Sequence, residues 1–133
     1  MLLAMDANMD KEKVWKSYHD PQGLFAKFMR NGLAHSNRIL GYDWYREEDW
    51  DLLGVWSDDT FMHRFVYKAK RRVTCEPIGL NFLEGAEIDC YEAFKYAPAT
   101  MQRQFSAAGF DQVNMWKSPS SAICKFVGTL STF

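Results

Sequence analysis

The opening strand is the feature that most constrains the fold. Residues Met1 to Met5 form a short apolar run that ends in an acid, Asp6, and a polar helix start follows at Asp10. This order is typical of an interior strand of a parallel α/β sheet that leads into its next element. The given sequence shows no earlier strand, glycine-rich nucleoside loop or second strand-end acid. We therefore expect the back half of a cofactor-dependent α/β protein, with its cofactor half supplied by another chain, lost, or never needed.

Composition and charge restrict the class of protein. The 133 residues are 47% hydrophobic and 16% aromatic, which is enough to build the core of one domain. The net charge is -1, and the basic run from Lys68 to Arg72 is more typical of a solvated strand end than of a nucleic-acid surface. No apolar run reaches the roughly 18 residues of a membrane span, and a basic signal region is absent. We expect a cytoplasmic protein with neither nucleic acid nor membrane as a partner.

The cysteines and histidines predict no metal site. Cys75, Cys90 and Cys124 are an odd, widely spaced set, as expected of reduced core residues. The three histidines lack metal-ligand spacing. His19 beside Asp20 has two interpretations, a general base next to a pocket or a surface histidine, and the second is the more typical.

The hydrophobic pattern predicts three zones. Residues 10–41 should be helical, with an N-cap at Asp20-Pro21 and a C-cap glycine at Gly41. Residues 50–94 should be rich in strands, and residues 97–133 should form one helix and two antiparallel strands. The predicted strands are Asp51 to Ser57, Phe61 to Lys68, Val73 to Cys75, Ile88 to Phe94, Gln112 to Trp116 and Ala122 to Leu130.

Two amphipathic patterns suggest how these zones pack. Apolar residues at helical spacing predict a core-facing stripe. They are Leu24, Phe25, Phe28, Met29, Leu33 and Leu40. The stretch from Phe61 to Lys68 alternates between two partly apolar sets, which predicts a sheet with a helix on one face and a pocket on the other.

Three segments carry a resemblance to a known family. The stretch Phe82 to Tyr96 (FLEGAEIDCYEAFKY) resembles a hallmark of the histidine-specific N-methyltransferases, and Ser17 to Leu33 is similar to their Tyr-x-Asp-x-x-Gly segment. With Asn37 to Gly41, the chain looks closest to the fungal secondary-metabolism branch, which acts on 4-dimethylallyltryptophan. The Ala107 to Phe110 turn resembles the way the sheet of a class I S-adenosylmethionine methyltransferase closes. The resemblance extends from Leu2 to Leu130.

The resemblance implies an α+β fold with the cofactor half missing. Residues 8–94 would be a substrate-binding lobe of helices and antiparallel strands. Residues 1–7 and 95–133 would be the C-terminal strands of a Rossmann-like sheet, and 1–133 together a single domain.

The resemblance also implies a substrate site. Its residues would be Tyr18, Phe28, Asn31, Tyr91, Ala93 and Phe94. From the residues alone, Tyr18 could instead be a helix-end tyrosine and Asn31 an exposed helix residue. Family members carry a glutamate and a serine at the positions of Tyr91 and Ala93. Glu92 is one position away, and strand alternation should point it to the opposite face.

The loss of the acid and hydroxyl changes what the site can bind. A carboxylate orients an amine by charge-assisted hydrogen bonds, whereas a phenol and a methyl group cannot do so in the same way. We therefore expect a small aromatic or apolar ligand rather than a zwitterion such as histidine.

Two functions follow as hypotheses. The first is the C-terminal substrate-binding portion of an amino-acid N-methyltransferase of the fungal alkaloid type, truncated or split and inactive alone. The alternative is a stand-alone small-molecule binder or cofactor-independent enzyme. S-adenosylmethionine is implied by the family, but we expect no cofactor or metal to be bound by this chain alone. The apolar strand from Leu2 to Met5 should pair with another chain, giving a homo-oligomer or a complex with a cofactor-binding chain.

Overall fold

The protein is an α+β fold built on antiparallel sheets. The computed structural model describes residues 1–130, apart from the side chains of Gln112 and Val113. The last three residues of the predicted 95–133 segment lie outside the described part. The helices are α1 (Lys11–Tyr18), α2 (Leu24–Leu40) and α3 (Pro98–Ala107), with two 3-10 turns, η1 (Glu47–Asp49) and η2 (Glu76–Ile78). The strands are β1 (Leu2–Asp6), β2 (Trp50–Ser57), β3 (Met62–Ala69), β4 (Val73–Cys75), β5 (Leu80–Phe82), β6 (Glu87–Phe94), β7 (Phe110–Lys117) and β8 (Ile123–Leu130).

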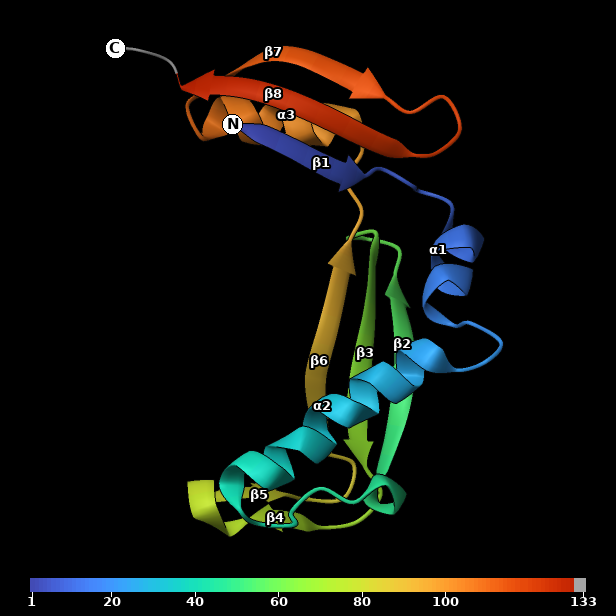
Figure 1. Ribbon diagram of the computed structural model, residues 1–133, viewed down its shortest axis with the longest axis vertical. Helices are drawn as coiled ribbons and strands as arrows, with labels where there is room; N and C mark the ends of the chain where they lie inside the picture. The colour runs from blue at the N-terminus through green and yellow to red at the C-terminus, as the bar shows by residue number, and fades with distance from the viewer. Residues whose placement is uncertain (131–133) are drawn as a thin grey trace.

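One region of the molecule joins the two ends of the chain. Its three-stranded sheet has the order β1-β8-β7, and α3 packs against it (Figure 1). The core consists of four apolar side chains, Met101, Phe105, Cys124 and Phe126. We call this the terminal-sheet region.

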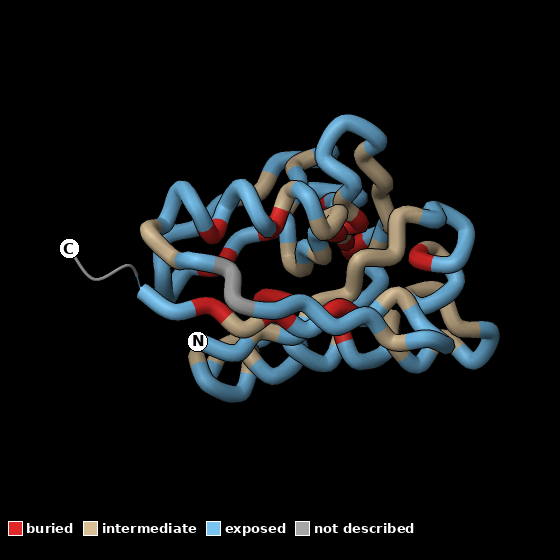
Figure 2. Tube along the Cα trace, turned by 90° about the horizontal axis from the view of Figure 1, so that it is seen from above, coloured by how far each residue is buried: buried red, intermediate tan, exposed pale blue. Residues whose placement is uncertain are grey.

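The second region contains the middle of the chain. Its sheet has the order β2-β3-β6, with the short pair β4-β5 at one end, and α2 crosses one face (Figure 1). Its largest buried cluster consists of Trp44, Tyr45, Trp50, Tyr67, Ala69, Val73 and Cys75. We call this the central-sheet region. Figure 2 shows that buried residues occupy only short stretches of the trace, while much of the chain is exposed.

The opening strand has different neighbours from those expected. Rather than lying between parallel strands, β1 lies at the edge of the described sheet and pairs antiparallel with β8, Leu3 opposite Phe126. An apolar run carries no information about the direction of its neighbours, which explains the error, and no residue of β1 is in fact buried. Leu2 is 72% exposed, and the other edge of β1 has no partner among the described residues.

The helical zone is divided by a turn. α1 is capped by Asp10, whose carboxylate accepts from the backbone N–H groups of Glu12 and Lys13. The predicted N-cap at Asp20 was wrong in position, because α2 begins only after Gly23. Asp20 still accepts hydrogen bonds from Leu24 N and Phe25 N of the first turn.

The two amphipathic patterns are confirmed in part. Gly41 ends α2 in the left-handed conformation, as predicted. Of the predicted stripe, Met29 is buried, but Leu24 and Phe28 are 62% and 66% exposed. The predicted helix on one face of the central sheet is confirmed, since α2 crosses that face (Figure 1). The opposite face, where a pocket was predicted, carries the ion pairs Arg64–Asp89 and Lys68–Glu87.

Candidate functional site

Aromatic rings from three elements converge on Tyr18. This residue ends α1, and its ring centroid lies 5.7 Å from that of Tyr91 on β6 and 5.2 Å from that of Phe25 on α2. Phe25 also contacts Tyr91 at 5.2 Å and Phe65 of β3 at 5.4 Å. The two positions that the resemblance selects from distant parts of the sequence, Tyr18 and Tyr91, are therefore neighbours in the fold.

The phenol of Tyr18 is held by a buried ammonium group. Lys95, 7% exposed, donates from Nζ to Tyr18 Oη at 3.2 Å and to Asp6 Oδ2 at 2.9 Å. Asp6 is the last residue of β1 and Lys95 follows β6, so this ion pair joins the two regions beside the aromatic cluster. Because Lys95 occupies a lone pair of the phenol oxygen, the Tyr18 hydroxyl proton is directed elsewhere.

Two histidines lie close to Tyr18, and one of them stacks on its ring. His63, the fully buried second residue of β3, stacks on the Tyr18 ring at 4.8 Å. Its Nε2 lies 3.0 Å from Nε2 of His19. Trp15 stacks on the other side of His19 at 4.0 Å. A Cβ at Gly54 would lie only 2.4 Å from the His19 ring, so this glycine makes room for the imidazole.

The surroundings favour uncharged imidazoles and a charged lysine. Burial, followed by the positive charges of His19 and Lys95, lowers the pKa of His63 to about 4. Burial also lowers the pKa of His19. Burial alone would lower the pKa of Lys95, but its hydrogen bonds to Asp6 and Tyr18 raise it above the ordinary value. Burial and the hydrogen bond with Tyr18 raise the pKa of Tyr91. A histidine of such low pKa is a poor proton acceptor near neutral pH.

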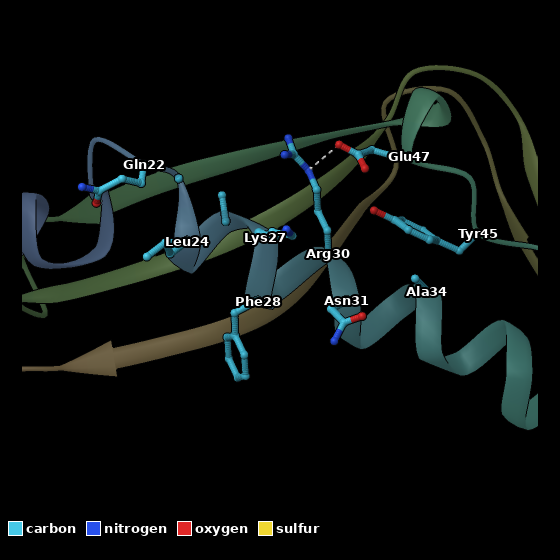
Figure 3. Close-up of a pocket in the computed structure, with 11 residues that line it drawn as sticks. Gln22, Leu24, Lys27, Phe28, Arg30, Asn31, Ala34, Tyr45 and Glu47 are labelled. Atoms are coloured by element: carbon cyan, nitrogen blue, oxygen red, sulfur yellow. Dashed lines mark ion pairs between the residues drawn. The ribbon is translucent and has the colours of Figure 1, made fainter.

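Apart from the aromatic cluster, a concavity lies along the outer side of α2. Its volume is about 910 Å³ and it is open to solvent on a broad side. Figure 3 shows Phe28 and Asn31 pointing away from the ion pair between Arg30 and Glu47, whereas Tyr45 lies next to that pair. Phe28 reaches the aromatic cluster only through Phe25, whose ring centroid lies 5.9 Å away. The structure thus places Phe28 and Asn31 in this concavity, beside the cluster rather than within it.

The predicted residues on β6 fall into two groups, one on the α2 side of the sheet and one outside the aromatic cluster. Tyr91 pairs with Phe65 and Ala93 with His63, so both lie on the α2 side of the sheet. Glu92 is exposed on the opposite face, as strand alternation predicted. Phe94 is 41% exposed and stacks on Tyr96 instead of joining the cluster.

Sequence reasoning missed the polar half of the site. Asp6, Lys95 and the contact between His19 and His63 were not predicted. The only available signal was His63 itself, a titratable residue within an otherwise apolar alternating set. The interpretation of His19 as a surface residue was wrong, since it is half-buried between Trp15 and Gly54.

The site also has to be judged against a metal or a nucleoside cofactor. Among residues 1–130, no group of three or more His, Cys, Asp or Glu side chains could hold a metal ion. Nucleotide cofactors of open α/β sheets bind where parallel strands diverge, with a carboxylate on the ribose. All the strand pairs within the described residues are antiparallel. The acid at the strand end, Asp6, is bound to Lys95. The described residues therefore do not by themselves form such a nucleoside site.

Comparison with known proteins identifies the family. Residues 1–129 match the model of the histidine-specific, S-adenosylmethionine-dependent methyltransferases. The chain is 32% identical over 128 residues to N-methyltransferase fsqC of Aspergillus fumigatus, covering 94% of this chain and 34% of that protein. It is 30% identical to Ergothioneine biosynthesis protein 1 of Neurospora crassa, covering 87% of this chain and 13% of that protein. It is 26% identical to Histidine N-alpha-methyltransferase of Mycolicibacterium smegmatis, covering 90% and 38%.

The chain belongs to the histidine-specific, S-adenosylmethionine-dependent methyltransferase family. The predicted resemblance is thereby confirmed. The chain spans about a third of the length of the fungal N-methyltransferase and of the bacterial relative. None of the described helices is both long and apolar enough to cross a membrane.

Proposed function

We propose that this chain supplies the substrate-binding portion of an S-adenosylmethionine-dependent N-methyltransferase, and that its substrate is an amine carrying an aromatic or apolar group. The observation that carries the proposal is the meeting of Tyr18 and Tyr91, at 5.7 Å, in a chain of this family. The names of the fungal relatives support the reaction type, since both fsqC and imqF are called N-methyltransferases. Membership of the secondary-metabolism branch is part of the proposal.

The cluster would recognise its substrate by stacking and by one hydroxyl. Tyr91, Phe25 and Tyr18 offer aromatic faces and edges to a flat apolar group. The Tyr18 hydroxyl, whose oxygen accepts from Lys95, can donate its proton to the substrate. Tyr91 and Ala93 offer no carboxylate on this side of the sheet. A charged group on the substrate, other than the reacting amine, would therefore lose hydration without gaining a partner. Phe28 and Asn31 would contact the more distant part of a large substrate.

The test compares ligand classes on matched variants. L-tryptophan, tryptamine and L-histidine are titrated by calorimetry into the chain and into Tyr91→Ala. We expect the two indoles to bind more tightly than histidine, and Tyr91→Ala to weaken them by about 1–3 kcal/mol. Phe94→Ala is the control, since Phe94 stacks on Tyr96 outside the cluster. Histidine binding as tightly as tryptophan would contradict the proposal.

The cofactor is proposed to depend on segments outside this chain. The described residues do not form a nucleoside site, and the relatives are much longer than this chain. We therefore expect weak or no binding of S-adenosylmethionine to the isolated chain, and no transfer activity alone. Tight, saturable binding in calorimetry would overturn this part.

The unpaired edge of β1 is the proposed point of attachment. Leu2 is exposed there, and backbone groups of an open strand edge readily pair with another strand. The occupant we propose is a cofactor-binding segment or chain, because such a segment would extend the terminal sheet. Light scattering that shows concentration-dependent self-association would instead identify a second copy of this chain as the occupant.

A further inference from the structure

The two histidines form a built pair rather than a chance contact. β3 is paired on both sides at His63, with Trp56 of β2 and Ala93 of β6. The backbone therefore fixes its position. His19, at the end of α1, approaches over Gly54, where any side chain would overlap the ring. Trp15 covers the outer face of His19. Three elements thus cooperate to hold two imidazole nitrogens 3.0 Å apart.

The hydrogen-bonding pattern of the pair can be assigned. Nδ1 of His63 is buried and has no partner in the described part of the chain. An unpaired N–H in such a place is more costly than an unpaired lone pair, so the His63 proton belongs on Nε2. His63 then donates from Nε2 to Nε2 of His19, which carries its own proton on Nδ1. This arrangement requires a neutral His19, and it disfavours a second proton on His63, because that proton would lie on the buried Nδ1 without a partner.

We propose that the neutral His19–His63 pair holds Tyr18 in its ligand-facing position, so that adding a proton to the pair releases Tyr18. The inference rests on the proposed function only in treating Tyr18 as part of a ligand site. His63 supports one face of the Tyr18 ring at 4.8 Å, while Lys95 lies 5.3 Å from the ring centroid and holds the hydroxyl. Both residues act through Tyr18 and are positioning residues.

The charges around the pair explain the sensitivity to protons. From α1 the titratable neighbours are His19 and Tyr18, and from β6 and the residue after it they are Tyr91 and Lys95. β1 contributes Asp6, which is bound to Lys95. β2 contributes the uncharged Gly54 and Trp56, and α2 contributes Phe25. A proton on His63 would lie on the unpartnered Nδ1 and would place a second cation beside Lys95, with no free carboxylate among the described neighbours. Repulsion would push Lys95, and the Tyr18 hydroxyl that it holds, away from His63.

A proton on His19 would disturb the pair in a different way. The protonated His19 ring must donate from Nε2, so His63 would have to move its own proton to the buried Nδ1, where it has no partner. Either protonation therefore breaks the present arrangement. The low pKa of both histidines agrees with this geometry.

The experiment follows the rings of the full chain by NMR between pH 7.5 and 4, with histidine and tyrosine side chains labelled. We expect His63 to titrate more than one pH unit below the ordinary histidine pKa near 6.5, and the Tyr18 signals to move at the midpoint of the pair. In His19→Gln, which leaves the buried ring in place, the Tyr18 signals should shift already at pH 7.5. His63→Phe, which keeps a ring under Tyr18, should abolish the pH-dependent movement.

Binding of L-tryptophan at pH 7.5 and 4 separates this inference from the proposed function. We expect the dissociation constant to rise about twofold at pH 4, where about half of His63 carries a proton, and the rise to vanish in His63→Phe. If the Tyr18 signals follow the titration of His63 but tryptophan binds at neither pH, the result supports the histidine pair and counts against the proposed ligand. Tryptophan binding with Tyr18 signals that ignore the titration of His63 would overturn the inference.

Discussion

The terminal-sheet and central-sheet regions differ in what they bury. The core of the terminal-sheet region is apolar throughout, with Phe126 and Cys124 almost without solvent contact. The central-sheet region also buries polar groups, among them Asp49 and His63. An apolar core needs only shape and volume to be satisfied, whereas a buried polar group needs a partner in the correct place. The central-sheet region therefore depends more on specific polar partners than the terminal-sheet region does.

The contact between the two regions is itself polar. Asp6 comes from the terminal sheet and Lys95 from the chain that leaves the central sheet. Their ion pair lies beside Tyr18, so the candidate site is built where the two regions meet. A variant of the terminal core should therefore act on stability, while variants of the polar residues should act on stability and on the site together.

The largest effect is expected in the terminal core. Phe126→Ala removes a side chain that is 1% exposed and should destabilise the protein by about 3–5 kcal/mol, because a cavity remains. Urea denaturation followed by circular dichroism measures the change. Leu130→Ala, at a side chain that is 67% exposed, is the control and should change stability by less than about 0.5 kcal/mol. Equal losses in the two variants would contradict the assignment of this core.

Acid should destabilise the central-sheet region through His63. An unfolded histidine takes up its proton near pH 6.5, whereas folded His63 does so only at about 4. The stabilisation is therefore complete above pH 6.5 and is lost as the pH falls towards 4, by about 2–3 kcal/mol at pH 4.5. Urea midpoints at pH 7 and 4.5 measure it.

His63→Phe is the matched control for the acid experiment. Asp10 and Asp20, whose pKa values are lowered by backbone hydrogen bonds, also lose stabilisation in acid, and only the difference between the two proteins reports on His63. An unchanged loss in the variant would show that His63 does not contribute.

The polar contact between the regions should have an intermediate effect. Asp6→Asn leaves the ammonium group of Lys95 without its carboxylate and should cost about 1–3 kcal/mol, since Asp6 remains partly exposed. The same titration of stability with urea measures it. Asp58→Asn removes a carboxylate from an exposed pair with Lys11 and should cost less than about 1 kcal/mol. Similar values for both would show that the contact is an ordinary surface pair.

The smallest effects are expected at two glycines. Gly54→Ala places a methyl group 2.4 Å from the His19 ring, which has to move, and should cost about 1–2 kcal/mol. Gly32→Ala meets no atom within 4 Å in the middle of α2 and should stabilise the protein by about 0.5–1 kcal/mol. Thermal unfolding measures both changes. A stabilising Gly54→Ala would mean that the helix end does not hold His19 against β2.

Local signals predicted most of the elements. The two predicted strands Asp51 to Ser57 and Phe61 to Lys68 lie where the structure has the hairpin of β2 and β3, and the predicted glycine at Gly41 lies at the end of α2. Each depends on neighbours in sequence, such as turn geometry or a left-handed cap. The strand β5 was missed, although its equally short partner β4 was predicted.

The sequence predicted only some of the residues of the candidate site. Tyr18 and Tyr91 came from the resemblance, and the fold brings them together. Phe94 and Phe28 were selected in the same way, yet the structure places them outside the cluster. Phe94 follows Ala93 directly on β6, so strand alternation places it on the opposite face, as it does Glu92.

By itself, then, the sequence determined the secondary elements, the family and the two tyrosines, because these depend on short-range patterns and matched motifs. Only the tertiary structure decided that β1 pairs with β8, that Lys95 joins Asp6 to Tyr18, and that His19 meets His63 over Gly54. Those contacts join residues 44 to about 120 positions apart in the chain. Their energies depend on burial and on the exclusion of water, which exist only once both sheets have folded around them.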